Sequence, residues 1–213
     1  MPRLTSVHGQ ACGLLLFSCL AAFGQEHDTW LEAGISTYGP TIAPAASLSE
    51  RFAVRAPISV AGYGTHYTDR DGNTYEVDLS AFQAALMADF HPFENGFRLS
   101  SGFAFGGYRA TGRVDDPVYQ GVTIPGEVSL RMAQKVPAAP QVAVGYTSGA
   151  RRNLGLFAEI GVRYAPYRIS YSSDQVLTPG QRAGLEATVA DMNDDLNSFG
   201  FTPFAAFGVT LNF

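Results

Sequence analysis

Residues 201–213, the end of the chain, constrain the fold more than any other stretch. Every second side chain there is apolar, and the side chains between them are small or polar except for Phe204; the apolar set is Phe201, Pro203, Ala205, Phe207, Val209, Leu211 and Phe213. Successive side chains of a β-strand point to opposite faces, so the pattern predicts a strand with one apolar face. A strand of about 10 residues crosses a bilayer when it is tilted.

Residues 1–24 have the features of a secretory signal peptide. Arg3 precedes an apolar run at residues 11–23, and the small residues Ala22 and Gly24 suit a cleavage site. The run is shorter than a spanning helix needs, and no later stretch supplies one. Cys12 and Cys19 both lie in this segment, so the expected mature domain, residues 25–213, has no disulfide. The alternative is a lipoprotein signal with Cys19 acylated, which Phe17 fits poorly.

Charge and hydropathy narrow the class of protein. The formal net charge is −5, and Lys135 is the only lysine. Nucleic-acid binding would need a basic face, so we expect none. The mean hydropathy is near zero. A transmembrane barrel has such an average because apolar lipid-facing residues alternate with polar lumen-facing ones.

Alternating segments along the chain predict eight strands. They lie near residues 29–36, 41–48, 52–66, 75–91, 97–106, 142–146, 154–164 and 201–213. An even number is expected when both ends of a barrel are periplasmic. If residues 29–48 formed one bent strand, only seven would remain. The apolar parity reverses before Ser80, which predicts either a bulge there or a strand that projects beyond the membrane.

Residues 113–137 and 172–200 are predicted to be long extracellular loops, and the second one contains a helix. Helical spacing is seen for Leu185, Val189, Met192 and Leu196. Residues 178–181 supply an N-cap at Thr178, a proline at the first helical position and a glutamine at the third, which together predict a capping box. We expect a helix from about 179 to 197 whose apolar stripe packs on the barrel mouth or on the other long loop. The alternative, a helix on the membrane surface, is disfavoured because the polar face is acidic, with Asp191, Asp194 and Asp195.

These patterns together predict an all-β fold. It is an eight-stranded antiparallel transmembrane up-and-down barrel with a short helix in the last extracellular loop. The order of a short first hairpin, the HPFENG turn at residues 91–96, the LFAEIG strand at residues 156–161 and the closing strand is similar to the carbapenem-associated, ornithine-uptake outer-membrane barrels of bacteria. That resemblance implies a monomer in the bacterial outer membrane that passes small basic amino acids. It also implies an assembly signal at Leu211 and Phe213 for the barrel-assembly machinery.

The side chains on the polar strand faces are the candidate site. Six of them are charged: Glu32, Arg55, Asp89, Arg98, Glu159 and Arg163. Because an arginine facing lipid at the bilayer midplane costs about 2 to 4 kcal/mol, we expect these residues to line the lumen and to pair with one another. An eight-stranded barrel is only wide enough for its interior to be filled by side chains, so a plugged lumen and a charge-lined path are both compatible with the pattern.

The acidic loops bear on the choice of partner. Acids outnumber bases in the three longer loops, residues 67–78, 113–137 and 172–200. Such a surface concentrates cations, which is compatible with basic amino acids, with divalent ions that bridge lipopolysaccharide or with no specific partner. Residues 69–73 lack the spaced ligands and final glutamate of a calcium loop, so we expect no metal and no cofactor. His66 and His91 have no partner in the sequence that suggests catalysis, so we do not expect an enzyme.

Three functions follow from these observations. The first is an outer-membrane barrel acting as a narrow porin for small cationic or basic amino-acid solutes, in contact with outer-membrane lipid and lipopolysaccharide. The second is a plugged structural or surface barrel without transport. The third is a secreted lipocalin-like barrel that binds an apolar ligand inside, since periodicity does not determine which face points inward.

Overall fold

The protein is described by a computed structural model. It places residues 28–213 except 69–73, 94, 120–121, 149–152 and 198–199. The predicted signal peptide, with Cys12 and Cys19, and the loop at residues 69–73 lie outside the described residues. Within the part of the chain that is described, no helix has the length and apolarity that a membrane-spanning helix requires.

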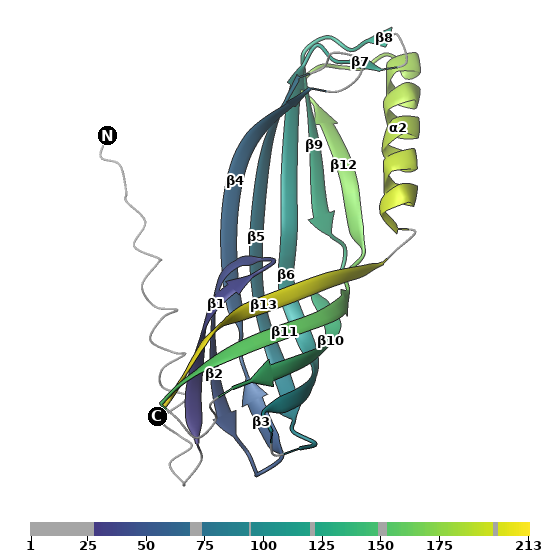
Figure 1. Cartoon of the computed structure of the whole chain (residues 1–213). Helices are drawn as coiled ribbons and strands as arrows, with labels where there is room; N and C mark the ends of the chain where they lie inside the picture. Colours follow the sequence, from purple (N-terminus) through teal and green to yellow (C-terminus); the bar gives the residue numbers. More distant parts are fainter. Residues whose placement is uncertain (1–27, 69–73, 94, 120–121, 149–152, 198–199) are drawn as a thin grey trace, which may run out of the picture.

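The described strands close an antiparallel ring of eight (Figure 1). In ring order they are β1 (Thr29–Ser36), β2 (Gly39–Ser47), β3 (Phe52–Arg55) with β4 (Ile58–Thr68), β5 (Thr74–Phe90), β6 (Phe97–Asp115), β10 (Ala138–Thr147), β11 (Leu154–Tyr164) and β13 (Phe201–Asn212). Each strand pairs with the strands before and after it in this ring order, and β13 pairs with β1 to close the ring. The predicted all-β, eight-stranded up-and-down barrel is therefore confirmed.

β3 and β4 are two halves of a single barrel strand. Arg55 pairs with Met87 and Ile58 pairs with Ala84, so the register against β5 is unchanged across the break. The break falls at Ala56 and Pro57, where proline has no N–H to donate to the ladder. The break therefore adds no member to the ring.

The first hairpin is a true hairpin and not one bent strand. β1 and β2 pair along their whole length, with Ser36 opposite Gly39 at the turn. β1 also pairs with β13, where Leu31 lies opposite Leu211. The barrel closes through this hairpin, which accounts for the even number of strands.

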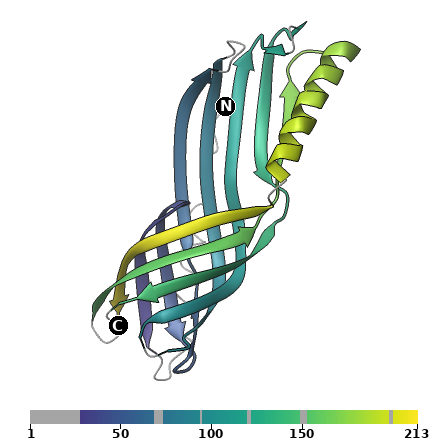
Figure 2. The same ribbon diagram turned by 45° about the vertical axis from the view of Figure 1, so that its right-hand side comes forward.

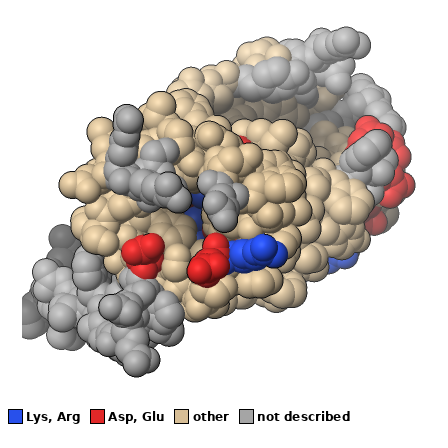
Figure 3. Space-filling model, turned by 60° about the horizontal axis from the view of Figure 1, so that its bottom comes forward, with Lys and Arg blue, Asp and Glu red and all other residues tan. Residues whose placement is uncertain are grey.

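The closing strand β13 has the two faces that its sequence predicts. Phe207 is 62% exposed and Phe201 58% exposed, whereas Phe204 and Thr210 on the other face are buried. The outward residues of β10 and β11, such as Val144 and Ile160, are exposed in the same way. An apolar belt therefore surrounds the ring, and Figure 3 shows few charged side chains on its outer wall.

The prediction of a long loop at residues 113–137 is wrong. β6 continues to Asp115, β7 (Val118–Tyr119) and β8 (Val122–Thr123) form a small pair, and β9 (Glu127–Gln134) pairs with β6. β12 (Tyr167–Ser173) pairs with β9 and takes part of the second predicted loop. Val128, Leu130 and Met132 alternate with polar residues as a strand requires, but the charges and prolines around them favoured a loop.

These strands form a second region above the ring, in the order β4-β5-β6-β9-β12 (Figures 1 and 2). We call it the upper sheet. β6 exchanges its partner β10 for β9 between Phe105 and Arg109. Gly106 lies at this branch point with φ +75°, a conformation that L side chains rarely adopt.

No bulge is present near Ser80. β5 pairs without interruption with β4 and with β6, and Ser80 lies opposite Gly62 and Arg109. The reversal of apolar parity instead marks the place where β5 leaves the ring and enters the upper sheet. Of the two alternatives, the bulge is wrong, and the strand projects beyond the ring.

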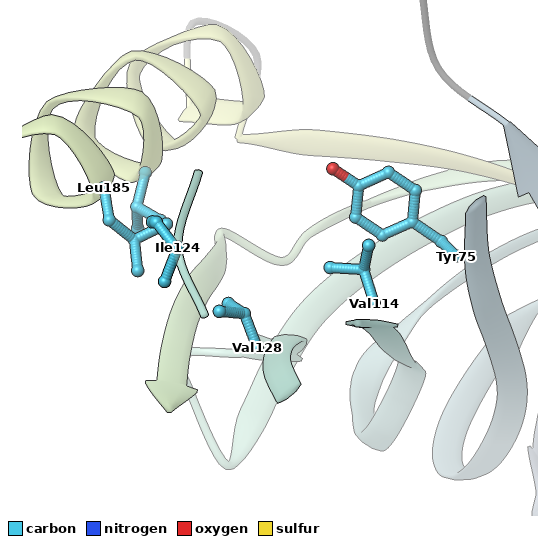
Figure 4. Packing of buried hydrophobic residues seen from close by; sticks show 6 residues of the cluster. Tyr75, Val114, Ile124, Val128 and Leu185 are labelled. Atoms are coloured by element: carbon cyan, nitrogen blue, oxygen red, sulfur yellow. The ribbon is translucent and has the colours of Figure 1, made fainter. Parts of the chain in front are cut away.

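Helix α2 (Pro179–Asn197) has the predicted bounds. Its capping box forms, since the Thr178 N–H donates to Gln181 Oε1 (3.0 Å) and the Gln181 N–H donates to Thr178 Oγ1 (3.4 Å). Leu185 and Val189 pack on Tyr75, Val114, Ile124 and Val128, a group we call the helix cluster (Figure 4). Of the two expected packing partners, the helix uses the segment that was predicted as the other long loop.

Candidate functional site

The charged side chains that the sequence singled out are all buried in the ring. Their exposed fractions are 0% for Glu32, 3% for Arg55, 0% for Asp89, 1% for Arg98, 5% for Glu159 and 0% for Arg163. They come from β1, β3, β5, β6 and β11, whose outward faces are apolar. Alternation along each strand therefore places these charges on the inner face.

Arg55 joins three carboxylates. Its Nε donates to Asp89 Oδ2 (2.9 Å) and its Nη1 to Glu32 Oε2 (3.3 Å). Its Nη2 donates to Glu159 Oε2 and also reaches Ser100 Oγ (3.4 Å). One guanidinium thus links strands β1, β3, β5, β6 and β11 across the interior.

Arg98 is the second cation of the same network. It donates to both oxygens of Glu32, to Glu159 Oε2 (3.2 Å) and to Thr147 Oγ1 (3.0 Å). Gly145 leaves room for it, because a Cβ there would lie 2.8 Å from Arg98 Nε. Two arginines therefore bridge three carboxylates, and the network carries one negative charge in excess. We call these five residues the charge network.

A layer of uncharged polar side chains lies beside the charge network. Gln83 Nε2 donates to Gln141 Oε1 (3.4 Å), and Gln141 Nε2 lies 2.7 Å from Met87 Sδ. The cavity that both glutamines line with Glu32 and Arg55 has a volume of about 20 Å³. That volume holds about one water molecule, so side chains fill the interior at this level.

Arg163 lies apart from the charge network, and the expectation that it pairs with Glu159 or another acid is wrong. Its Nη2 donates to Gln134 Oε1 (3.1 Å) and to the Tyr167 hydroxyl (3.0 Å), and its Nη1 to the Gly106 carbonyl (3.4 Å). Arg163 follows Glu159 by four positions on β11, which places their Cα atoms about 13 Å apart. Arg163 therefore ties the ring to β6, β9 and β12 of the upper sheet.

Aromatic rings close the lumen around Arg163. The guanidinium carbon lies 4.5 Å from the centroid of the buried Tyr38 ring, a cation–π contact. Tyr38 stacks on Tyr108 with centroids 4.6 Å apart, and the Tyr108 hydroxyl donates to the Thr37 carbonyl (2.7 Å). The interior is thus blocked at two levels, by the charge network and by this aromatic layer.

The acidic residues of α2 do not reach the lumen. Asp191, Asp194 and Asp195 are exposed. The helix contacts β12, where the Asn193 side chain accepts a hydrogen bond from Ile169 N (2.8 Å) and donates one to Ile169 O (2.9 Å). The acids therefore belong to the surface of the upper region.

His66 and His91, the two histidines considered from the sequence, lie in different parts of the molecule. His66 is exposed on β4, and its Nε2 lies 3.5 Å from Glu76 Oε1. His91 follows β5 and is half-buried, and this burial lowers the pKa of its imidazole. Among the described residues, no group of three or more His, Cys, Asp or Glu side chains is placed to hold a metal ion.

Comparison with known proteins defines the fold. No protein-family model matches the sequence, and no curated protein matches it either. The crystal structure of Acinetobacter baumannii CarO2 superposes with a TM-score of 0.58 at 17% identity, covering 87% of this chain and 98% of that one. That of Acinetobacter baumannii CarO gives 0.56 at 19% identity, covering 86% and 97%.

The chain has the CarO barrel fold. The resemblance drawn from the sequence is therefore confirmed for the fold over most of the chain. At this level of identity the likeness carries over no binding residues, so the roles of the six charged residues rest on their own geometry.

Sequence reasoning missed the residues that surround Arg163. Gln134 and Tyr167 lie on β9 and β12, which were not recognised as strands. Tyr38 was taken as part of a turn signal, yet it is 1% exposed. Gln83 and Gln141 carry no charge, so only their place on an inward face distinguished them from surface residues.

Proposed function

We propose that the protein is an outer-membrane β-barrel with a lumen that is closed at rest. The exposed apolar belt supports the membrane placement, because side chains such as Ile160 (68% exposed) and Phe207 (62% exposed) would otherwise face water. Outward apolar residues alternating with inward polar ones are the arrangement that a bilayer selects. The CarO fold is consistent with it.

The observation that carries the closed lumen is the charge network. Each of its five residues is at most 5% exposed, and every one has a charged partner within the barrel. A buried charge that loses its partner costs several kcal/mol, so such a network resists opening. A secreted barrel that binds an apolar ligand inside would need an apolar interior, which these residues do not provide.

A narrow porin for small cations is the second candidate. The excess negative charge of the network and the exposed acids of α2 favour cationic solutes, and the family resemblance implies passage of basic amino acids. A solute could pass only if the network and the aromatic layer around Arg163 rearranged. The two candidates therefore differ in one measurable property, the permeability of the unmodified barrel.

Liposome flux separates the two candidates. For a closed barrel, ornithine, arginine and glutamate should each enter no faster than into protein-free liposomes. A variant that opens both levels, with Glu32→Ser and Arg98→Ser in the charge network and Tyr38→Ser in the aromatic layer, should raise the flux, which shows that the assay detects an open lumen. A porin would instead pass ornithine and arginine faster than glutamate, with a preference that falls as salt screens the charges.

The porin also predicts an effect of α2. Neutralising Asp191, Asp194 and Asp195 to asparagine should reduce the preference for cations without unfolding the barrel. Unchanged selectivity in that variant would remove these acids from the pathway. The oligomeric state is expected to be monomeric, which light scattering of the folded protein in detergent measures.

Assembly at the outer membrane is proposed to depend on Leu211 and Phe213. The Phe213 N–H donates to the Thr29 carbonyl (3.0 Å), and Leu211 pairs with Leu31 and Leu154 on the flanking strands. Replacing Phe213 with aspartate should block assembly by the barrel-assembly machinery but not secretion. Cell fractionation with a heat-modifiability gel measures both, and a normal folded barrel in this variant would contradict the role.

A further inference from the structure

Three arginines form a compact group on the upper sheet. Arg109 of β6 and Arg168 of β12 both lie directly opposite Ala133 of β9. Arg131 lies on β9, two positions before Ala133. Residues paired in this way share a face of the sheet. With strands about 4.8 Å apart, the Cα atoms of Arg109 and Arg168 are about 10 Å apart.

The face that carries these arginines is the one turned away from α2. On β6, β9 and β12 the alternate residues Val114, Val128 and Tyr171 belong to the helix cluster or pack against it. Because Arg109, Arg131 and Arg168 have the opposite parity, they lie on the other face of the sheet, and all three are exposed. We call these three residues the arginine patch.

Nothing described in the structure neutralises the arginine patch. The residues that share its rows on the same face are Ser80, Thr111, Ser170 and Ala133, with Asp78 of β5 at the far end of the Arg131 row. The ion pairs formed within the described ranges of the chain do not include these arginines, whereas Arg113 in the next row lies 3.9 Å from Asp78. The patch is therefore a local positive charge on a chain whose net charge is −5.

The position of the patch relative to the apolar belt indicates its partner. The outward side chains of the ring end in aromatic rings: Phe105 is 49% exposed, Phe82 pairs with Gly107, and Tyr164 contacts Phe201 edge-on at 5.4 Å. Arg109 follows Phe105 by four residues, about 13 Å along β6. Aromatic rings occupy the membrane interface, so the patch lies at the level of the lipid headgroups.

We propose that Arg109, Arg131 and Arg168 bind the phosphate groups of phosphorylated glycolipid in the outer leaflet, with the lipid chains against the aromatic edge of the ring. This inference rests on the proposed outer-membrane placement. Guanidinium groups bind phosphate oxygens through paired, charge-assisted hydrogen bonds, and three of them can contact one phosphorylated headgroup. Lipid anchored there would hold the upper sheet upright on the membrane.

Binding of lipid A to the folded full-length barrel in detergent tests the proposal. Fluorescent bis-phosphorylated lipid A should bind more tightly than its dephosphorylated form. The variant Arg109→Gln, Arg131→Gln, Arg168→Gln should lose about 100-fold in affinity, at about fivefold per arginine near an anionic surface. The control Arg51→Gln with Arg182→Gln, which removes two exposed arginines that lie outside the upper sheet, should lose less than about threefold because charges far from the patch are screened.

Three results would overturn the proposal: equal binding of the dephosphorylated lipid, unchanged affinity in the first variant, or equal losses in both variants. Displacement of the lipid by inorganic phosphate at matched ionic strength would also overturn it, since it would make the patch a small-anion site. Fractionation of cells that express the unmodified protein tests the membrane placement separately. An outer-membrane barrel that binds lipid A without using the patch would disprove only this inference.

Discussion

β5 and β6 run through both the ring and the upper sheet. In the ring their apolar side chains face outward, whereas in the upper sheet their apolar side chains lie on the opposite face. In the ring, the inward face of β5 carries Asp89 and Gln83 while the outward face carries Leu86 and Phe82. In the upper sheet, the same inward face carries Tyr75 and packs on α2. Because the register is continuous, the backbone does not turn over; only the surroundings of the strand change.

In the proposed outer-membrane placement, this inversion distinguishes a region that faces lipid from a region that faces water. In the ring, the outward face is apolar and the inner face holds charges that are paired with one another. In the upper sheet, the apolar face is covered by α2, and the outward face carries polar and charged residues such as Arg113. The change falls at Ser80 on β5, and the proposed outer-membrane placement therefore puts the boundary between lipid and water at that level.

Removing Arg55 should have the largest effect on the ring. Arg55→Ala leaves Asp89, Glu32 and Glu159 without one of their cations in a buried site, so the free energy of unfolding should fall by about 3 to 5 kcal/mol. Urea titration of the barrel refolded in lipid vesicles measures it. The exposed Arg51→Ala is the control and should change stability by less than about 0.5 kcal/mol. A small change for Arg55→Ala would mean that the interior is hydrated.

A matched pair on the outward face of β5 sharpens the boundary between the regions. Leu86→Arg should destabilise the barrel in vesicles by about 2 to 4 kcal/mol, because the charge would face lipid. Ser80→Arg on the same face should cost less than about 0.5 kcal/mol, because it faces water. The same titration measures both, and similar costs at the two positions would place Leu86 outside the bilayer.

The helix cluster should behave as a separate unit. Leu185→Ala removes a side chain that is 1% exposed, and we expect a loss of about 2 to 3 kcal/mol from the docking of α2. Hydrogen exchange should become faster in α2 and β12 while the heat-modifiability of the ring stays unchanged. The exposed Ala187→Ser serves as the control. Faster exchange throughout the ring would show that the two regions unfold together.

The smallest loss of stability is expected for the contact between Asn193 of α2 and the backbone of β12. Asn193→Ala removes the two hydrogen bonds to the backbone of Ile169, which should cost about 1 to 2 kcal/mol locally. Asn193→Asp keeps the acceptor and loses the donor, so its effect should be intermediate. Exchange of the Ile169 amide reports on both variants, and protection equal to that of the unmodified protein would remove this contact from the account.

The ring could be predicted from the sequence because its signals are local. Alternation in residues 201–213 and 154–164, short links and the capping box of α2 each fix one element without knowledge of the others. The lumen charges could also be identified, since Glu32, Arg55 and Asp89 occupy the polar positions of alternating strands. The upper sheet could not be recognised, because β9 has arginine and glutamate on its solvent face and therefore looks like a loop.

The pairing within the lumen depended on information that no single strand contains. Register between strands decides that Arg55 meets Asp89 and Glu159, and it also separates Arg163 from both. The prediction of an acidic partner for Arg163 was wrong because its side chain reaches β9 and β12. Because β9 was predicted as a loop and residues 165–171 were assigned to no element, Gln134 and Tyr167 were not considered.

A cysteine scan along β5 tests most directly the claim that the ring lies in the bilayer and the upper sheet in water. Both native cysteines fall in the predicted signal peptide, so single cysteines at positions 76, 78, 80, 82, 84 and 86 would be unique in the mature chain. In vesicles, a membrane-impermeant thiol reagent should label positions 76 to 80 rapidly and positions 82 to 86 very slowly. Equal labelling at positions 78 and 86 would contradict the account.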